Sequence, residues 1–397
     1  MIASMIALTA SRLYTPLDCV EQALVLIDGD TIVEVASRAL CEVPTGAKTI
    51  DFCEAILAPG FVDIHIHGGA GHDVMNDDSS GLAAMERLLA THGVTSYFPT
   101  TVTAPVDKTC SALERLAGAI ERAGDKSRPQ PSGIHLEGPF ISHLRRGVHP
   151  TADLLRPTIE MFDRFWQAAR GHIRVMTIAP ELEGATEVIA EAARRGVCVS
   201  LGHSNADLDT ARAGIAAGAR HCTHGFNAMR PMDHREPGIV GAMLTDPRLS
   251  ADIIADGIHL DPVVVKLFLT AKGPDSSVLI TDATAATGMP DGRYRLGTFE
   301  VEVKDGRCMA DGKLAGSVLT MDRAVRNVMQ FADWDLQQAL RPASLNPARV
   351  AGLVGRGKIE PGARADIVVL SSSGEVEATI VGGVVAEAAG AKARISG

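Results

Sequence analysis

The chain has 397 residues, of which 46% are hydrophobic but only 4% aromatic, and its formal net charge is −10. A chain of this length predicts a large α/β domain, alone or with a smaller companion, and its small aliphatic residues suit parallel strands packed under helices. The acidic balance, without any block of basic residues, argues against a nucleic-acid surface or a polybasic membrane contact. We therefore expect a small-molecule partner.

The seven cysteines are scattered and include no C-x-x-C pair, which argues against a disulfide framework and indicates reduced thiols. No apolar run approaches the ~20 residues of a membrane span. The apolar start of the chain, residues 1–13, lacks the basic region and cleavage site of a signal peptide. We therefore expect a soluble, cytoplasmic protein.

The predicted elements begin with β-type alternation, as at residues 23–35 with a turn at 28–30. From residue 61 onward, short apolar runs alternate with longer amphipathic stretches, as in repeated βα units. Eight strands are predicted at residues 62–67, 94–100, 133–137, 173–179, 197–203, 221–224, 250–255 and 278–282. Helices are predicted at residues 80–91, 157–169, 186–195, 207–217 and 262–271. A β-hairpin at 294–304, turning at 305–306, and β-type stretches at 366–370 and 378–385 follow.

This order favours an α/β fold in which eight βα units form a (β/α)8, TIM-like barrel. A doubly wound open sheet is the main structural alternative. Neither end of the chain has enough strands for a stable sheet of its own. We therefore expect a small β-sandwich domain built from residues 1–57 and 355–397, and a barrel domain formed by residues 58–354.

Chemically reactive side chains gather where the predicted strands end. Barrel enzymes build their sites at the C-terminal ends of the strands, so these positions are the first candidates. His65 and His67 close the first strand and share one face, because strand side chains alternate. The third, fifth, sixth and eighth strands end with Glu137, His203, His224 and Asp282.

These residue types predict a metal-dependent hydrolase. Imidazole nitrogens and carboxylate oxygens suit Zn²⁺ and other first-row divalent ions. Glu137, His203 and His224 would form a three-ligand site that leaves a position for water. Water bound there would lose its proton near neutral pH, and Asp282 is placed to shuttle that proton during attack on an amide.

The alternative interpretation is that each buried histidine is only a hydrogen-bonded core residue, which is the usual case for a single buried histidine. Six candidates that converge on strand ends outweigh it. His135 and Cys222 lie two residues before expected ligands and are interpreted as deeper layers of the barrel. The remaining histidines without a partner pattern are interpreted as structural or solvated: His72, His92, His172 and His221.

Several motifs resemble a known family. The stretch 59–68, PGFVDIHIHG, resembles the opening signature of the amidohydrolase superfamily. More specific are HLEGPF at 135–140, LGHS at 201–204, THGFNAM at 223–229, REPG at 235–238, DGIH at 256–259 and TDA at 281–283. Their order and spacing resemble N-acetylglucosamine-6-phosphate deacetylases over essentially the whole chain.

The resemblance implies a role for each matching residue. It implies that Glu137, His203 and His224 bind metal, and that Asp282 activates water and then protonates the leaving amine. It implies that His149 contacts the substrate near the scissile acetamide. It also implies a set of residues that hold the sugar phosphate, Asn227, Ala228, Arg235 and His259, and a loop against the N-acetyl group that includes Ala315, Gly316 and Ser317.

The same resemblance bears on the metal and on assembly. The expected cofactor is a divalent metal, zinc first, with iron, cobalt and manganese as alternatives. Some family members lack both histidines of the first strand and use one metal, whereas this chain keeps His65 and His67, so a second metal stays open. No lysine stands at a suitable strand end, so Glu137 would have to bridge the two metals. The resemblance further implies a homodimer in which Arg235 reaches the site from the partner subunit.

The predicted reaction is metal-dependent hydrolysis of the acetamide of N-acetyl-D-glucosamine 6-phosphate, an amino-sugar phosphate, to D-glucosamine 6-phosphate and acetate. A dihydroorotase-like ring hydrolase or an N-acyl-amino-acid deacylase is the nearest alternative, because metal chemistry alone does not name the substrate. Arg235, His259 and the Asn227–Ala228 turn argue against it. A non-catalytic scaffold is a further alternative, and the intact ligand set with Asp282 argues against that.

Overall fold

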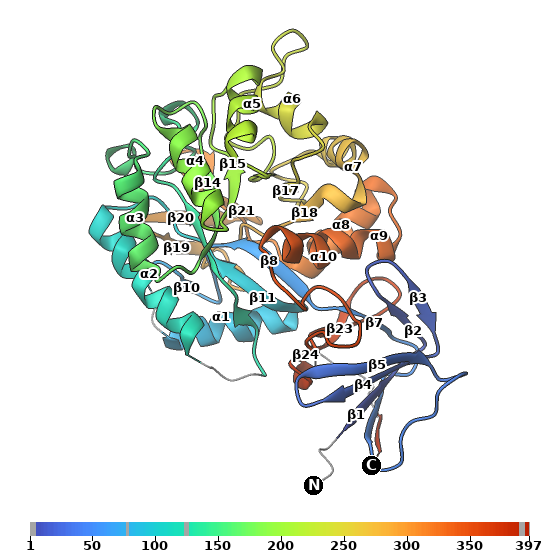
Figure 1. The fold of residues 1–397 in the computed structure, drawn as a ribbon. Helices are drawn as coiled ribbons and strands as arrows, with labels where there is room; N and C mark the ends of the chain where they lie inside the picture. Colours follow the sequence, from blue (N-terminus) through green and yellow to red (C-terminus); the bar gives the residue numbers. More distant parts are fainter. Residues whose placement is uncertain (1–4, 77–78, 123–126, 389–393, 397) are drawn as a thin grey trace.

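The computed structural model describes residues 5–76, 79–122, 127–388 and 394–396. Its centre is a set of short parallel strands surrounded by helices (Figure 1). Strands overlap all eight ranges predicted for the βα units: β8 (Phe61–Ile66), β11 (Val94–Pro99), β13 (Ile134–Glu137), β14 (Ile173–Ile178), β15 (Cys198–Leu201), β16 (His221–Cys222), β17 (Ala251–Ile253) and β18 (Ser277–Leu279). Most end one to three residues earlier than predicted.

Parallel pairing joins β8 to β11, then β13 through β14 and β15 to β16, and β17 to β18. Single bridges continue this order, since Thr100 pairs with His135 and Ile66 pairs with Ala283, both in parallel. The Cys222 N–H also donates to the Ser250 carbonyl oxygen at 3.0 Å, next to β17. The ends of these strands are therefore brought to one side of the molecule.

The predicted helices are present with shifted boundaries, and further helices occur that the sequence analysis did not predict. The predicted ones are α1 (Ser79–Thr91), α3 (Ile159–Ala168), α4 (Ala185–Arg194), α5 (Leu208–Ala217) and α7 (Pro262–Ser276). The others are α2 (Val106–Glu121), α6 (Gly238–Thr245), α8 (Met321–Ala332), α9 (Leu336–Leu340) and α10 (Leu345–Val350), with short 3₁₀ turns at His143–Arg145, Thr151–Asp153 and Arg341–Ala343. No helix in the described ranges is long and apolar enough to cross a membrane.

Strands from both ends of the chain pair with one another (Figure 1). A five-stranded sheet has the order β26-β6-β1-β4-β5, and a six-stranded sheet has the order β25-β24-β23-β7-β2-β3. The first contains β1 (Ile6–Thr9), β4 (Ala23–Asp28), β5 (Thr31–Ser37), β6 (Lys48–Asp51) and β26 (Arg394–Ser396). The second contains β2 (Arg12–Tyr14), β3 (Cys19–Glu21), β7 (Ile56–Pro59), β23 (Ile367–Leu370), β24 (Val376–Val381) and β25 (Val384–Ala388).

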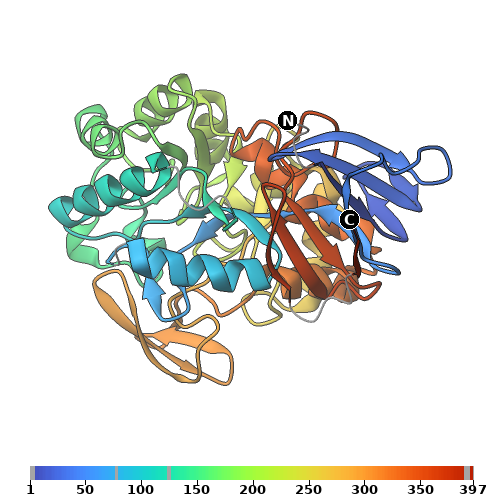
Figure 2. The same cartoon turned by 90° about the horizontal axis from the view of Figure 1, so that it is seen from below.

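A four-stranded antiparallel sheet follows the eighth barrel-type strand and projects away from the terminal sheets (Figure 2). We call residues 292–314 the insert; it contains β19 (Gly292–Leu296), β20 (Phe299–Lys304), β21 (Arg307–Ala310) and β22 (Lys313–Leu314). The predicted hairpin turn at Asp305-Gly306 joins β20 to β21, whereas an earlier turn at Gly297 (φ 59°) divides the predicted strand in two. Short strands of two residues lie next to the first barrel-type strands: β9 (Gly68–Gly69) and β10 (His72–Asp73) follow β8, and β12 (Gln130–Pro131) precedes β13.

Candidate metal centre and active site

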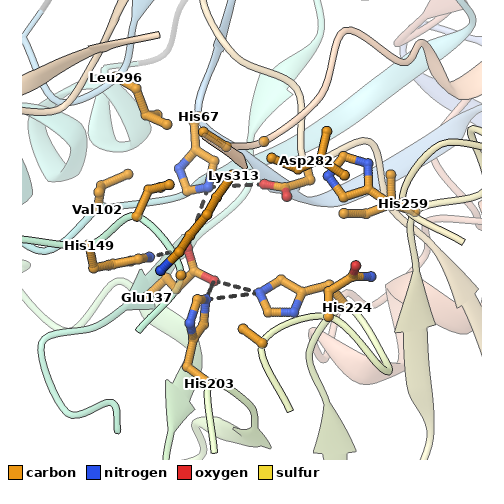
Figure 3. A pocket seen from close by; sticks show the side chains of 18 of the residues that line it. His67, Val102, Glu137, His149, His203, His224, His259, Asp282, Leu296 and Lys313 are labelled. Carbon is orange, nitrogen blue, oxygen red and sulfur yellow. Dashed lines mark hydrogen bonds and ion pairs between the residues drawn. The ribbon is translucent and has the colours of Figure 1, made fainter. Parts of the chain in front are cut away.

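Glu137, His203 and His224 form a compact buried group (Figure 3). Glu137 is the last residue of β13, and each histidine lies two residues beyond the end of its strand, β15 or β16. The Nε2 atoms of His203 and His224 lie 3.3 and 3.1 Å from Glu137 Oε1 and 3.1 Å from each other. The three ligand-type atoms therefore lie close together, as predicted from their positions at the C-terminal ends of parallel strands.

A second group of ligand-type atoms lies beside the first and contains His65, His67 and Asp282. Asp282 Oδ1 lies 3.5 Å from His65 Nε2 and 3.1 Å from His67 Nε2. The same two nitrogens lie 3.5 and 3.4 Å from Glu137 Oε2. Glu137 therefore stands between the groups and offers one carboxylate oxygen to each.

The donor set fits a divalent cation. His203 Nδ1 lies 2.8 Å from the Arg145 carbonyl oxygen, and His67 Nδ1 lies 3.0 Å from the Thr100 carbonyl oxygen. A carbonyl only accepts, so each Nδ1 carries a hydrogen, and each Nε2 is the nitrogen that would bind a metal. Burial raises the pKa of Glu137, but His65 and hydrogen bonds from His203 and His224 outweigh burial and hold this pKa well below its usual value. Imidazole lone pairs around an ionised carboxylate are the donors that zinc and other first-row divalent ions take.

The backbone of three site residues is left-handed, with φ of 45° at His203, 32° at His224 and 51° at Asp282. Such conformations cost about 1–3 kcal/mol each and persist where the surroundings hold them. The Asp282 N–H donates to the His65 carbonyl oxygen at 3.0 Å. The His224 N–H donates to the Asp252 carboxylate. These bonds hold the bends that aim the side chains inward.

Asp252 is not among the predicted site residues, and His221 is predicted only as structural or solvated. Asp252 and His221 are fully buried, and their side chains lie 2.8 Å apart, directly behind His224. Burial raises the pKa of Asp252, but the hydrogen bond from His221 outweighs burial and lowers it. An aspartate inside an otherwise apolar strand was the available signal, since a fully buried carboxylate needs a partner.

His149 borders both metal-ligand groups, and its ring is held by Thr103. The Thr103 N–H donates to His149 Nδ1 at 3.3 Å, and the Thr103 hydroxyl lies 2.8 Å from the same nitrogen. Burial lowers the pKa of His149 to about 3, so the ring is neutral and its hydrogen is on Nε2. This Nε2 lies 3.7 Å from Glu137 Oε2 and points into the cavity.

A cavity of about 330 Å³ opens above these residues. Its lining includes most of the residues predicted to contact substrate: His149, Asn227, Ala228, His259, Ala315 and Gly316. His259 Nδ1 lies 2.7 Å from Asp256 Oδ2, which fixes the ring and leaves Nε2 free for a ligand.

Two residues expected at the substrate do not line the cavity within this chain. The Ser317 hydroxyl is buried and donates to the Thr281 carbonyl oxygen at 2.6 Å. Arg235 lies on the exposed loop at residues 231–236, where its backbone N–H donates to Asp233. The Ser317 backbone N–H nevertheless donates to the Asp282 carbonyl oxygen at 2.7 Å, so Ser317 lies beside the site without lining the cavity, whereas Arg235 is not among the residues that line it.

The cavity also has lining residues that the sequence analysis missed. Val102 and Leu296 are apolar and lie on the side away from His259 (Figure 3). Lys313, at the start of β22, extends its side chain over the metal-ligand groups (Figure 3). The alternation of polar and apolar residues in the insert could have indicated that Leu296 is buried. It could not have indicated which element Leu296 faces.

A model of the amidohydrolase family matches residues 56–386. The chain is 42% identical over 342 residues to N-acetylglucosamine-6-phosphate deacetylase from Bos taurus, which covers 83% of this chain and 82% of that protein. It is 41% identical over 324 residues to N-acetylgalactosamine-6-phosphate deacetylase from Escherichia coli O157:H7, with 81% and 85% covered. The solved structure of an aspartate-to-alanine mutant of N-acetyl-D-glucosamine-6-phosphate deacetylase from Mycobacterium smegmatis, in complex with N-acetyl-D-glucosamine-6-phosphate, superimposes with a TM-score of 0.90 at 36% identity and covers 96% of this chain and 99% of that one.

Proposed function

We propose that this chain, which belongs to the amidohydrolase family and within it to the N-acetylglucosamine-6-phosphate deacetylases, hydrolyses N-acetyl-D-glucosamine 6-phosphate. One water is consumed: its oxygen bonds to the acyl carbon, the C–N bond breaks, and the amine nitrogen takes up a proton. The products are D-glucosamine 6-phosphate and acetate. The observation that carries the proposal is the convergence of Glu137, His203 and His224 beside Asp282, at the floor of one cavity.

The cofactor in this proposal is a divalent metal held by Glu137, His203 and His224, with zinc as the first candidate and iron, cobalt or manganese as alternatives. When bound, the metal polarises the amide carbonyl and lowers the pKa of water. This position is essential, whereas His65 and His67 form an accessory second position. If both positions held metal, Glu137 would contribute to both, and this is supported by its two oxygens, which face one group each.

Two side chains carry the proton and orient the amide. The Asp282 carboxylate takes a proton from the attacking water and delivers it to the amine nitrogen, a role that typically contributes about 10²–10⁴-fold to the rate. His149 donates a hydrogen bond from Nε2 to the acyl oxygen, where negative charge develops. The hydrogen bonds from Thr103 support this role because they keep the His149 hydrogen on the cavity side.

The phosphate end of the substrate lies at Asn227, Ala228 and His259 in this proposal. These residues supply few cations, so we assign a further one to Arg235 of a second subunit in a homodimer. The exposure of Arg235 on its loop supports this assignment. The planar guanidinium suits a phosphate, since it donates two parallel hydrogen bonds.

The architecture in this proposal is an eight-stranded barrel domain at residues 58–354 and a β-sandwich domain at residues 1–57 and 355–397. The bridge between Ile66 and Ala283 supports closure of the barrel, since it joins the ends of the first and eighth strands. A shared core supports the sandwich, because it contains Val25 of the five-stranded sheet and Ile367 of the six-stranded sheet.

The test is steady-state hydrolysis by the zinc-loaded protein, with acetate and free amine measured together. Three substrates are compared: N-acetylglucosamine 6-phosphate, its C4 epimer N-acetylgalactosamine 6-phosphate, and N-acetylglucosamine without phosphate. We expect kcat/KM to be highest for the first and at least tenfold lower for the sugar without phosphate. Absence of acetate release from every phosphorylated substrate, in protein shown to contain metal, would refute the proposed function.

A further inference from the structure

The cavity has two chemically different sides, separated by the metal-ligand groups (Figure 3). On one side lies His259, whose imidazole is polar (Figure 3). On the other side lie the apolar Val102 and Leu296, across His67 and Asp282 from His259, together with the polar groups of His149 and Lys313 (Figure 3). We call the surface formed by Val102 and Leu296 the apolar side. A substrate whose polar end binds at His259 and whose amide lies at the ligands must therefore extend its acyl group toward the apolar side.

The apolar side is a packed wall. Val102 and Leu296 have exposed fractions of only 2% and 3%, and both belong to the apolar cluster that forms the core of the insert. A Cβ atom placed on Gly297 would lie 3.4 Å from Val102 Cβ, so the turn after β19 rests directly on this valine. Ala315 is part of the same cluster and lines the cavity beside them.

We propose that Val102 and Leu296 determine which acyl groups this enzyme accepts and restrict it to acetyl; this inference rests on the proposed function. A methyl group fits against the wall, whereas each further methylene must displace atoms of a packed core. Closely packed interiors resist added volume, because their side chains already occupy favourable rotamers without large voids. The insert thus sets the length of the acyl chain, while the opposite side binds the sugar phosphate.

The test measures kcat/KM for glucosamine 6-phosphate carrying N-acetyl, N-propionyl, N-butyryl and N-hexanoyl groups, with wild type and with Leu296→Ala. One methylene in an apolar pocket changes kcat/KM by about 10–200-fold. We therefore expect wild type to lose at least tenfold from acetyl to propionyl and to leave the hexanoyl compound intact. Leu296→Ala should raise the butyryl-to-acetyl ratio at least tenfold.

Val301→Ala is the matched control, since Val301 belongs to the same apolar cluster of the insert but does not line the cavity. Its butyryl-to-acetyl ratio should equal that of wild type, which separates loss of packing from a change in the wall. If Leu296→Ala does not fold, the same comparison of butyryl-to-acetyl ratios is made with Val102→Ala.

The outcomes are distinct. A wild type that hydrolyses acetyl and hexanoyl compounds equally well overturns this inference and leaves the proposed function intact. A butyryl-to-acetyl ratio that changes as much in Val301→Ala as in Leu296→Ala or Val102→Ala also overturns it. No hydrolysis of any of the four compounds by metal-loaded wild type refutes the proposed function, and this inference with it.

Discussion

Replacing Asp252 with asparagine should weaken metal binding although Asp252 is not a ligand. Its carboxylate is fully buried and accepts two hydrogen bonds, from His221 Nε2 at 2.8 Å and from the backbone N–H of His224. An amide of the same shape has one oxygen, so at least one of these donors loses its acceptor. A hydrogen bond to a charged group contributes about 1.5–3 kcal/mol, and loss of such a supporting contact typically lowers metal affinity about 10–100-fold. We expect the metal affinity to fall because the backbone bend at His224, whose φ is 32°, is held less rigidly and no longer fixes the position of the His224 side chain.

The assay is a competition between the protein and a chromophoric chelator for zinc, together with the absorption spectrum of the cobalt-loaded protein. We expect the zinc Kd of Asp252→Asn to rise about 10–100-fold and the cobalt spectrum to change, because a ligand has moved. Asp246→Asn is the control, since that carboxylate pairs with Arg248 near the surface. A wild-type zinc affinity and cobalt spectrum in Asp252→Asn, even with a lowered Tm, would refute the reasoning.

Three further predictions follow from the proposed roles. Asp282→Asn should lower kcat by about 10²-fold or more while zinc content, measured by mass spectrometry, stays near wild type; normal turnover in the metal-loaded variant would contradict the proton role. Joint replacement of His65 and His67 with alanine should leave measurable activity and one metal per chain, whereas His203→Ala should lose both; equal loss in the two variants would mean that the essential group is misassigned. Arg235→Ala should lower kcat/KM about 10–100-fold on the phosphorylated sugar, from a lost charge-assisted bond of about 1.5–3 kcal/mol, and have little effect on the unphosphorylated sugar; an equal change on both would exclude a phosphate contact.

The sequence predicted the ligand-type residues because their signal is local. His65 and His67 share a face through the two-residue period of a strand, and Glu137 ends an apolar run. Since the carboxyl ends of parallel strands meet, three separate strand ends could be combined without any knowledge of the loops. The structure brings His203 and His224 to Glu137, where this reasoning placed them.

The sequence marks Asp252 as a buried carboxylate that needs a partner, but it could not identify the contacts of the supporting residues, because those contacts are not local. His221 and Asp252 belong to different strands, and neither has a partner at a helical or strand spacing in its own segment. The wall formed by Val102 and Leu296 depends on how the insert folds back onto a distant loop. The insert itself was predicted with its turn at Asp305-Gly306, because that pair is a typical turn sequence, whereas Gly297 is a single glycine with no such partner.

The position of Glu137 between the two groups determines which strands contribute ligand-type residues to each group. One oxygen faces His203 and His224, and the other faces His65 and His67, so β8 contributes to one group only. When His65 and His67 are removed, the buried Glu137 carboxylate loses the charge of His65 but keeps His203 and His224, so its ionised form stays partly compensated. We therefore expect the choice between one and two metals to depend on His65, His67 and Asp282, with the acyl wall and the phosphate side of the cavity unchanged by it.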